Sequence, residues 1–238
     1  MENEYGYIEL VDIISKLRSE NGCPWDKEQT HQTLIPCLLE ESYELMEALQ
    51  NNDMKLMKEE LGDVLLQVVM HSQIAKEENE FDINDVINDI AKKLVYRHPH
   101  VFKDTKVKDS EEVLRNWEEL KKQEKNEKTL VEAMDRVAKT LPALIRSQKV
   151  QKKAIKNEAL EINVEGLANE VKLALDNFED TDKTVVKADK TELIGELLFN
   201  IVKISTFFDI NPEIALTKSV EKFINRFRYI ENSRVNKD

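Results

Sequence analysis

Apolar residues recur at the period of an amphipathic α-helix along most of this chain. The first such segment is "IELVDIISKLR", residues 8–18. The same spacing predicts further helices at about 33–50, 54–78, 83–96, 110–125, 129–156, 164–178, 190–208 and 212–232. The pattern therefore predicts a protein built from helices.

Breaks in the pattern mark the ends of these segments. Residues 19–33 interrupt it with Pro24 and are predicted to form a structured loop. Asp82 or Asn84 is expected to cap the helix predicted at about 83–96. A kink is expected where Pro142 interrupts the longest segment.

Composition supports an all-α protein. Only 5 Gly and 5 Pro occur among 238 residues, and 34% of residues are charged, which suits solvent-exposed helices. The net charge of −12 disfavours a duplex nucleic-acid surface, because phosphate backbones need a basic footprint. The two cysteines fit no disulfide framework, and no apolar run reaches membrane-spanning length. We expect a soluble, cytoplasmic protein that binds neither nucleic acid nor membrane.

An internal repeat divides the chain. "GDVLLQVV" from Gly62 is similar to "GELLFNIV" from Gly195. We therefore expect two related helical-bundle units, residues 1–102 and 129–238, joined by a charged linker with one helix at 103–128. Each unit also carries a Lys-apolar-x-x-Arg segment, which contains Lys93 and Arg97 in the first and Lys222 and Arg226 in the second.

Two predicted helices of the first unit carry acidic residues beside their apolar faces. Glu41 and Glu44 are three residues apart on one helix, and Glu60 and Asp63 are three apart on the next. The break at residues 51–54 is short enough for an antiparallel hairpin, which lets the two pairs face each other. Like charges about 5 Å apart repel by roughly 3 kcal/mol at an effective dielectric near 20. A cation relieves this repulsion, and Mg²⁺ binds such oxygens while leaving positions open for water and phosphates.

Two other interpretations of these acids are open. One is that they form solvated helix faces in a chain with 47 acidic residues, and for Glu47 and Glu59 this interpretation is favoured. The other is a di-iron carboxylate bundle, but such bundles use Glu-x-x-His repeats that neither unit supplies. The combined spacing favours a magnesium site.

Seven segments resemble the MazG family, the all-α nucleoside triphosphate pyrophosphohydrolases. "NGCPWDKEQTHQTL", "LLEESYELMEAL", "EELGDVLLQVVMHSQIA" and "KKLVYRHPHVF" are similar to the family's N-terminal part. "LPALIRSQKVQKKA", "GELLFNIV" and "NPEIALTKSVEKFINRFRYIE" are similar to its C-terminal domain. The resemblance implies hydrolysis of (deoxy)nucleoside triphosphates to the monophosphate and pyrophosphate, with Mg²⁺ as cofactor and Mn²⁺ as a substitute. It also implies a homodimer and broad base tolerance.

The resemblance assigns roles to individual residues. It implies metal ligation by Glu41, Glu44, Glu60 and Asp63. It implies that the Lys-apolar-x-x-Arg segments, with Lys93, Arg97, Lys222 and Arg226, meet the phosphates. A metal-activated water would attack the α-phosphate, and Glu40 or Glu41 would take its proton or hold a second metal; the sequence does not choose between these roles. Trp25 either covers the nucleobase or plugs the end of the bundle.

The second copy departs from the acidic motif. Leu193 takes the place of Glu60, with Glu192 beside it, and Glu196 replaces Asp63. We therefore expect the active site in the first unit and a scaffold or dimerisation role for the second. Two alternatives remain, namely a non-catalytic module that senses nucleotides or binds a protein, and a carboxylate-bridged metal oxidase or store. Clearance of aberrant nucleotides and control of the nucleotide pool are both compatible with the sequence.

Overall fold

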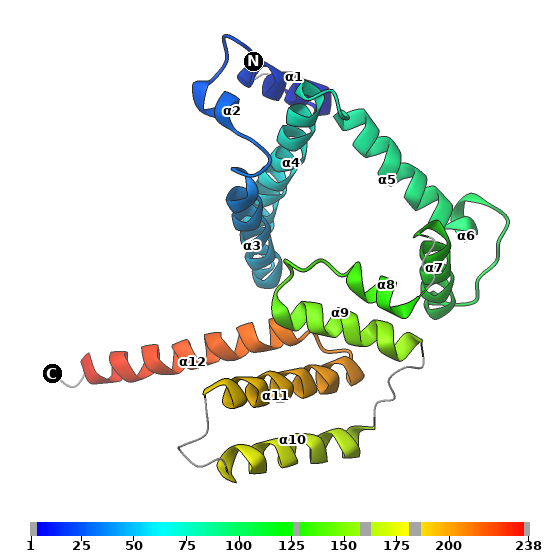
Figure 1. Ribbon diagram of the computed structural model, residues 1–238. Helices are drawn as coiled ribbons and strands as arrows, with labels where there is room; N and C mark the ends of the chain where they lie inside the picture. Colours follow the sequence, from blue (N-terminus) through cyan, green and yellow to red (C-terminus); the bar gives the residue numbers. More distant parts are fainter. Residues whose placement is uncertain (1–3, 126–128, 158–162, 181–186, 236–238) are drawn as a thin grey trace. The chain divides into compact units, whose positions relative to one another are not determined.

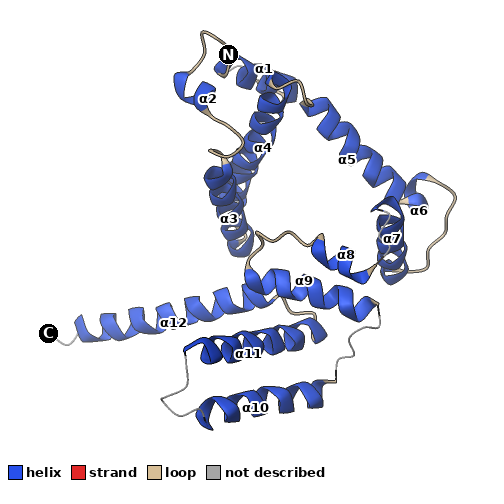
Figure 2. Cartoon of the chain, viewed as in Figure 1, coloured by secondary structure: helices blue, strands red, loops and turns tan. Residues whose placement is uncertain are grey.

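All regular structure in the described part of the chain is helical (Figure 2). The computed structural model describes residues 4–125, 129–157, 163–180 and 187–235. These ranges contain twelve helices and no strand, which confirms the all-α fold class. The helices are α1 Tyr7–Leu17, α2 Pro24–Glu28, α3 Ile35–Asn51, α4 Met54–Glu77, α5 Ile83–Arg97, α6 Pro99–Phe102, α7 Ser110–Lys125, α8 Leu130–Asp135, α9 Ala143–Lys156, α10 Val164–Asp180, α11 Lys187–Phe207 and α12 Pro212–Val235.

Two compact units make up the chain, residues 1–121 and residues 122–238. The boundary lies inside α7, whose bounds match the helix predicted within the charged linker. The first turn of α7 is capped by Asp109, whose carboxylate accepts a hydrogen bond of 2.8 Å from the backbone N–H of Glu112. Across the described ranges, no helix combines the length and the apolar character needed to cross a membrane.

An antiparallel hairpin of α3 and α4 is the centre of the first unit (Figure 1). Asn52 makes its turn in the left-handed conformation, with φ 53° and ψ 32°, a region that asparagine tolerates better than most residues. Asp53 then caps α4 by accepting hydrogen bonds from the backbone N–H groups of Lys55 and Leu56. The predicted hairpin is confirmed, and it brings two distant stretches of sequence face to face.

The apolar core of the first unit lies where α1 packs against the second half of α4. Its members are each at most 4% exposed and comprise Ile14, Leu34, Val69, Met70 and Ile74. Burial of one large aliphatic side chain contributes about 1.5–3 kcal/mol, so this cluster fixes the position of α4. Helix α4 therefore has an apolar second half that anchors it and an acidic first half that α3 faces.

Helix α5 begins at the predicted cap. The Asp82 carboxylate accepts hydrogen bonds from the backbone N–H groups of Asn84 and Asp85, and the N–H of Asp82 donates to the Asp85 carboxylate. The helix ends at Arg97, immediately before Pro99 begins the short α6. The cap predicted from the sequence is confirmed at Asp82.

The single helix predicted at 129–156 is wrong. Two helices, α8 and α9, occupy this range and are separated by a non-helical segment. Pro142 stands directly before α9 with φ −47° and ψ 139°. A proline has no backbone N–H and disfavours the helical conformation of the preceding residue, here Leu141, so the helix starts anew after Pro142 instead of bending through it.

Buried glutamines join α9 to α11 in the second unit. Gln151 is 1% exposed; its amide nitrogen donates to the backbone carbonyl of Phe199 at 2.9 Å, and its amide oxygen accepts from the Thr206 hydroxyl at 3.3 Å. Gln148 donates to the carbonyl of Ile210 at 2.7 Å. Because each amide is paired, its burial adds specificity without an unmet hydrogen bond. Helix α10 packs on α11.

Candidate metal centre

Three carboxylates meet between α3 and α4. Glu41 of α3 and Glu60 and Asp63 of α4 each offer one oxygen, and the three oxygens lie within 4.8 Å of one another. Glu60 is only 6% exposed, and the other two side chains belong to half-buried residues. Across the described ranges, this is the one group of three acidic, histidine or cysteine side chains that is close enough to share an ion. The hairpin thus brings Glu41 beside two acids that lie nineteen and twenty-two positions later in the sequence.

The carboxylates of this group repel each other. Burial raises the pKa of Glu41, and the charges of Asp63, Glu44 and Glu40 raise it further. Burial also raises the pKa of Glu60, with Glu44 and Asp63 as the next largest causes. A raised carboxyl pKa means that the folded state favours neutralisation of the negative charge. A bound proton or a bound cation achieves this.

The donor set fits a hard divalent cation. Carboxylate oxygens are the ligands that Mg²⁺, Mn²⁺ and Ca²⁺ prefer, whereas neither histidine nor cysteine belongs to the group. Glu44 is exposed and outside the close group of three, but its charge acts on both Glu41 and Glu60. Glu40 is also exposed, and its charge is felt by Glu41. The structure thus brings three of the four predicted ligands together and leaves Glu44 beside them.

The predicted phosphate-binding residues of the first unit lie on α5. Lys93 is exposed, and the Arg97 guanidinium lies 5.1 Å from the ring centroid of Trp117 on α7. The ammonium of Lys121 lies over the same ring at 4.8 Å. Trp117 therefore anchors the linker helix through cation–π contacts. Arg97 is held by an aromatic ring in this structure, and the predicted phosphate contacts of Lys93 and Arg97 stay predictions.

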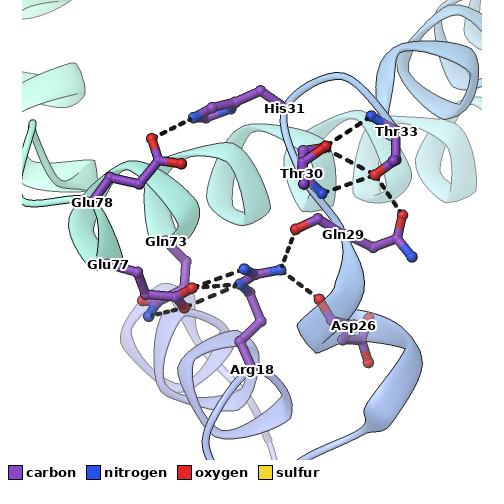
Figure 3. A network of polar contacts seen from close by, with 9 residues as sticks. All are labelled: Arg18, Asp26, Gln29, Thr30, His31, Thr33, Gln73, Glu77 and Glu78. Carbon is purple, nitrogen blue, oxygen red and sulfur yellow. Dashed lines mark hydrogen bonds and ion pairs between the residues drawn. The ribbon is translucent and has the colours of Figure 1, made fainter.

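Trp25 lies on α2, a short helix inside the segment that the sequence predicts as a loop, and 57% of it is exposed. Arg18 fixes this segment (Figure 3). Its side chain is 6% exposed, binds both carboxylate oxygens of Glu77, and donates to the backbone carbonyls of Asp26 and Gln29. Glu77 follows Asp63 by about four helical turns, roughly 21 Å along α4. Within one chain, the structure does not bring Trp25 to the carboxylates.

A pair of histidines ties the same segment to α4. The Nδ1 atoms of His31 and His71 are 2.8 Å apart, so one ring donates and the other accepts. A carboxylate oxygen of Glu78 lies 3.8 Å from Nε2 of His31 (Figure 3). Burial lowers the pKa of His71, and the neighbouring His31 lowers it further. Because only one of the two Nδ1 atoms can carry the shared hydrogen, the pair breaks when both rings are protonated.

The second unit gathers its remaining acids around an open pocket of about 670 Å³. Glu192 and Glu196, the two acids that the sequence comparison of the two copies singles out, line it together with Glu170. Lys203 also lines it and lies 3.7 Å from Glu170. Lys203 follows Gly195 by the same interval at which Met70 follows Gly62, so an ammonium stands here where the first unit has a thioether. Lys222 and Arg226 are exposed on α12.

Gln67 was missed by the sequence reasoning. It lies on α4 one turn after Asp63, is 5% exposed, and its side-chain oxygen is buried with no hydrogen-bond partner in the described structure. A signal was present, because Gln67 is the one polar residue in the apolar run "VLLQVVM". That run alone does not reveal which face of the helix is covered by α3.

Comparison with known proteins places this hairpin in a family. The model of the MazG nucleotide pyrophosphohydrolase domain matches residues 29–102, which include all three carboxylates. The nucleoside triphosphate pyrophosphohydrolase of Escherichia coli K12 is 42% identical over 226 residues, which are 93% of this chain and 86% of that protein. This chain belongs to the MazG family.

Other MazG-family relatives differ in how much of their length is matched. Thermotoga maritima MazG, named a nucleoside triphosphate pyrophosphohydrolase/pyrophosphatase, is 41% identical over 94% of this chain and 85% of its own length. The uncharacterized protein YabN of Bacillus subtilis is 47% identical over 93% of this chain, which spans only 45% of YabN. The crystal structure of a mazG-related protein from Thermotoga maritima is 31% identical and covers 48% of this chain and 98% of its own, with a TM-score of 0.42.

Proposed function

We propose that this protein hydrolyses (deoxy)nucleoside triphosphates to the nucleoside monophosphate and pyrophosphate at the α3–α4 centre, with Mg²⁺ as cofactor. One observation carries the proposal: the oxygens of Glu41, Glu60 and Asp63 lie within 4.8 Å of one another, inside the segment that matches the MazG model. The names of the relatives from Escherichia coli and Thermotoga maritima support the reaction class. A role in nucleotide-pool control or in the removal of aberrant nucleotides follows from this reaction.

The carboxylates would hold the cofactor, with Glu44 as the fourth predicted ligand. When bound, Mg²⁺ would neutralise phosphate oxygens and lower the pKa of a bound water for attack on the α-phosphorus, with pyrophosphate leaving. Glu60, buried between the helices, fixes the geometry of the ligand set, because a packed side chain keeps its rotamer. Glu40 and Glu41 are the candidates to accept the proton of that water. Glu40 is exposed at the edge of the group.

Cationic side chains would bind the phosphates. Lys93 and Arg97 lie four apart on one face of α5, and the planar guanidinium suits phosphate oxygens. The Arg97 guanidinium, which lies over the ring of Trp117, would contact the phosphates through N–H groups at its edge. Lys222 and Arg226 repeat the spacing on α12. Trp25 is proposed as the base contact.

A homodimer would bring in side chains that a single chain holds apart. Leu61, Leu65 and Val68 form a line on α4 at intervals of four and three residues and are 52%, 39% and 39% exposed. An exposed apolar line of this kind is typical of a helix that packs against a partner. Sedimentation equilibrium measures the assembly directly.

Product analysis tests the proposed reaction. The protein is incubated with each common (d)NTP and Mg²⁺, and the released phosphorus species are separated. We expect pyrophosphate and the monophosphate; orthophosphate with the diphosphate would mean attack at a different phosphorus. Binding of nucleotide without any turnover would support the non-catalytic nucleotide-sensing alternative, which the altered acids of the second unit favour.

A further inference from the structure

Gln67 carries an unmet hydrogen-bond acceptor into the interior of the α3–α4 hairpin. Its side-chain oxygen is fully covered and has no partner in the described structure, and the residue is 5% exposed. Buried polar atoms are paired in the great majority of cases, and an unpaired one lowers the stability of the fold. In "VLLQVVM" an aliphatic side chain at this position would pack without that penalty. The oxygen of this amide therefore lacks a hydrogen-bond donor among the described residues.

The direction of the side chain links it to the carboxylates. Glu60, Asp63 and Gln67 lie at intervals of three and four residues, so they share one face of α4. A helical side chain leans toward the N-terminus of its helix and covers the preceding turn. This lean directs the Gln67 side chain toward the turn that carries Asp63.

The position along α4 indicates which part of a ligand would meet this amide. Beyond Gln67 the same helix carries Val69 and Met70 of the apolar core, whereas the exposed Glu44 and Glu40 lie toward solvent. A nucleoside triphosphate held at its α-phosphate has a highly charged pyrophosphate end and a less polar nucleoside end. The charged end belongs at the solvent side, where cations can reach it, so the nucleoside end is directed toward Gln67.

We propose that the Gln67 carbonyl accepts a hydrogen bond from an O–H or N–H donor of the nucleoside, which makes Gln67 a specificity-determining residue of this centre. The inference rests on the proposed function. The flexible side chain turns its oxygen toward the ligand, and the unmet acceptor gains its partner only in the complex. A sugar hydroxyl and a base-edge N–H offer the same chemistry, and the experiment separates them.

The test uses Gln67→Met, which keeps the length of the side chain and removes its hydrogen-bonding groups, with the exposed Gln50→Met as the matched control. We expect the melting temperature of the Gln67 variant to equal or exceed that of the wild type, while kcat/KM falls up to about tenfold, mainly through KM. The Mg²⁺ concentration for half-maximal activity should not change. A Gln67 variant with unchanged kcat/KM overturns the inference, because the amide is then only a buried polar group.

Substrate analogues identify the donor and remain informative if the variant is poorly folded. The wild type should prefer deoxynucleotides to 2′,3′-dideoxynucleotides if a sugar hydroxyl is the donor, and Gln67→Met should lose that preference. Loss of discrimination among bases instead would assign the donor to the base edge. A wild type that discriminates in neither comparison overturns the inference. If the wild type releases no pyrophosphate at all, the proposed function fails separately, and binding of an α,β-methylene nucleotide decides the role of Gln67: equal affinity for wild type and variant overturns it.

Discussion

Replacement of Glu41 by glutamine tests the electrostatic account of the carboxylate centre. Glu41→Gln keeps the shape of the side chain and removes one of three negative charges whose oxygens lie within 4.8 Å. Two unit charges at that separation repel by about 1 kcal/mol at the dielectric of water and about 3 kcal/mol at an effective dielectric of 20. Glu41 is half-buried, so its repulsion from Asp63 lies between these limits. In a chelator, the variant should be more stable than the wild type by about 1–3 kcal/mol.

Magnesium should reverse this order. A ligand that binds only the folded state stabilises it by about 2.7 kcal/mol when its concentration is a hundred times its Kd. For a chain of this size, such a change raises the melting temperature by about 5–11 °C. The wild type should show this rise when Mg²⁺ replaces the chelator, and Glu41→Gln should show little or none because it has lost one ligand. Thermal unfolding followed by circular dichroism measures both effects.

The control variant is Glu47→Gln, which removes a charge from an exposed residue of the same helix. It should change neither the stability in chelator nor the response to Mg²⁺. The reasoning is refuted if Glu41→Gln is less stable than the wild type in chelator, or if both variants respond to Mg²⁺ as the wild type does. Acidification offers an independent check: because the folded state holds the pKa of Glu41 above its ordinary value of 4.5, this group adds stability as the pH falls toward 4.5.

Three further predictions concern activity, pH and the Arg18 contacts. Glu196→Gln should leave pyrophosphate release unchanged while Glu41→Gln lowers kcat about 100-fold or more; the opposite result would move the active site to the second unit. The folded state lowers the pKa of His71 from 6.5, so the free energy of unfolding should fall as the pH drops below 6.5, by at most about 1.4 kcal/mol per pH unit. Urea unfolding at pH 7.5 and pH 5.5 measures this loss, which should be smaller for His71→Gln than for the wild type. Arg18→Met should lower stability by about 1–3 kcal/mol and speed limited proteolysis within residues 19–33, and equal proteolysis rates would contradict the clamping role.

The hairpin and the placement of its acids were predictable because both depend on residues that are close together in the sequence. The apolar spacing predicts each helix. The break at residues 51–54 is so short that the second helix runs antiparallel to the first, and the intervals within each helix place Glu41 opposite Asp63. The cap at Asp82 is equally local. A capping side chain binds backbone N–H groups only two or three residues later, so few residues near the start of a helix can serve as its N-cap.

Features that depend on a partner helix were not predictable in the same way. The burial of Gln67 depends on the helices packed against α4, and periodicity along α4 does not reveal which of its faces they cover. The two buried glutamines of α9 look like a polar helix face in the sequence, yet Gln151 pairs with α11 and Gln148 pairs with the loop after α11. The break before Pro142 was misjudged as a kink, because a proline at a helix start and a proline inside a bent helix leave similar apolar spacing around them.

Lys203 gives the acids of the second unit a counter-charge that belongs to the chain itself. Its ammonium lies 3.7 Å from the Glu170 carboxylate and lines the same pocket as Glu192 and Glu196. Because this charge is covalently attached, it is present at any concentration of free cations. The first unit has the uncharged thioether of Met70 at the corresponding position, so relief of the repulsion among its carboxylates depends on protons or ions from solution.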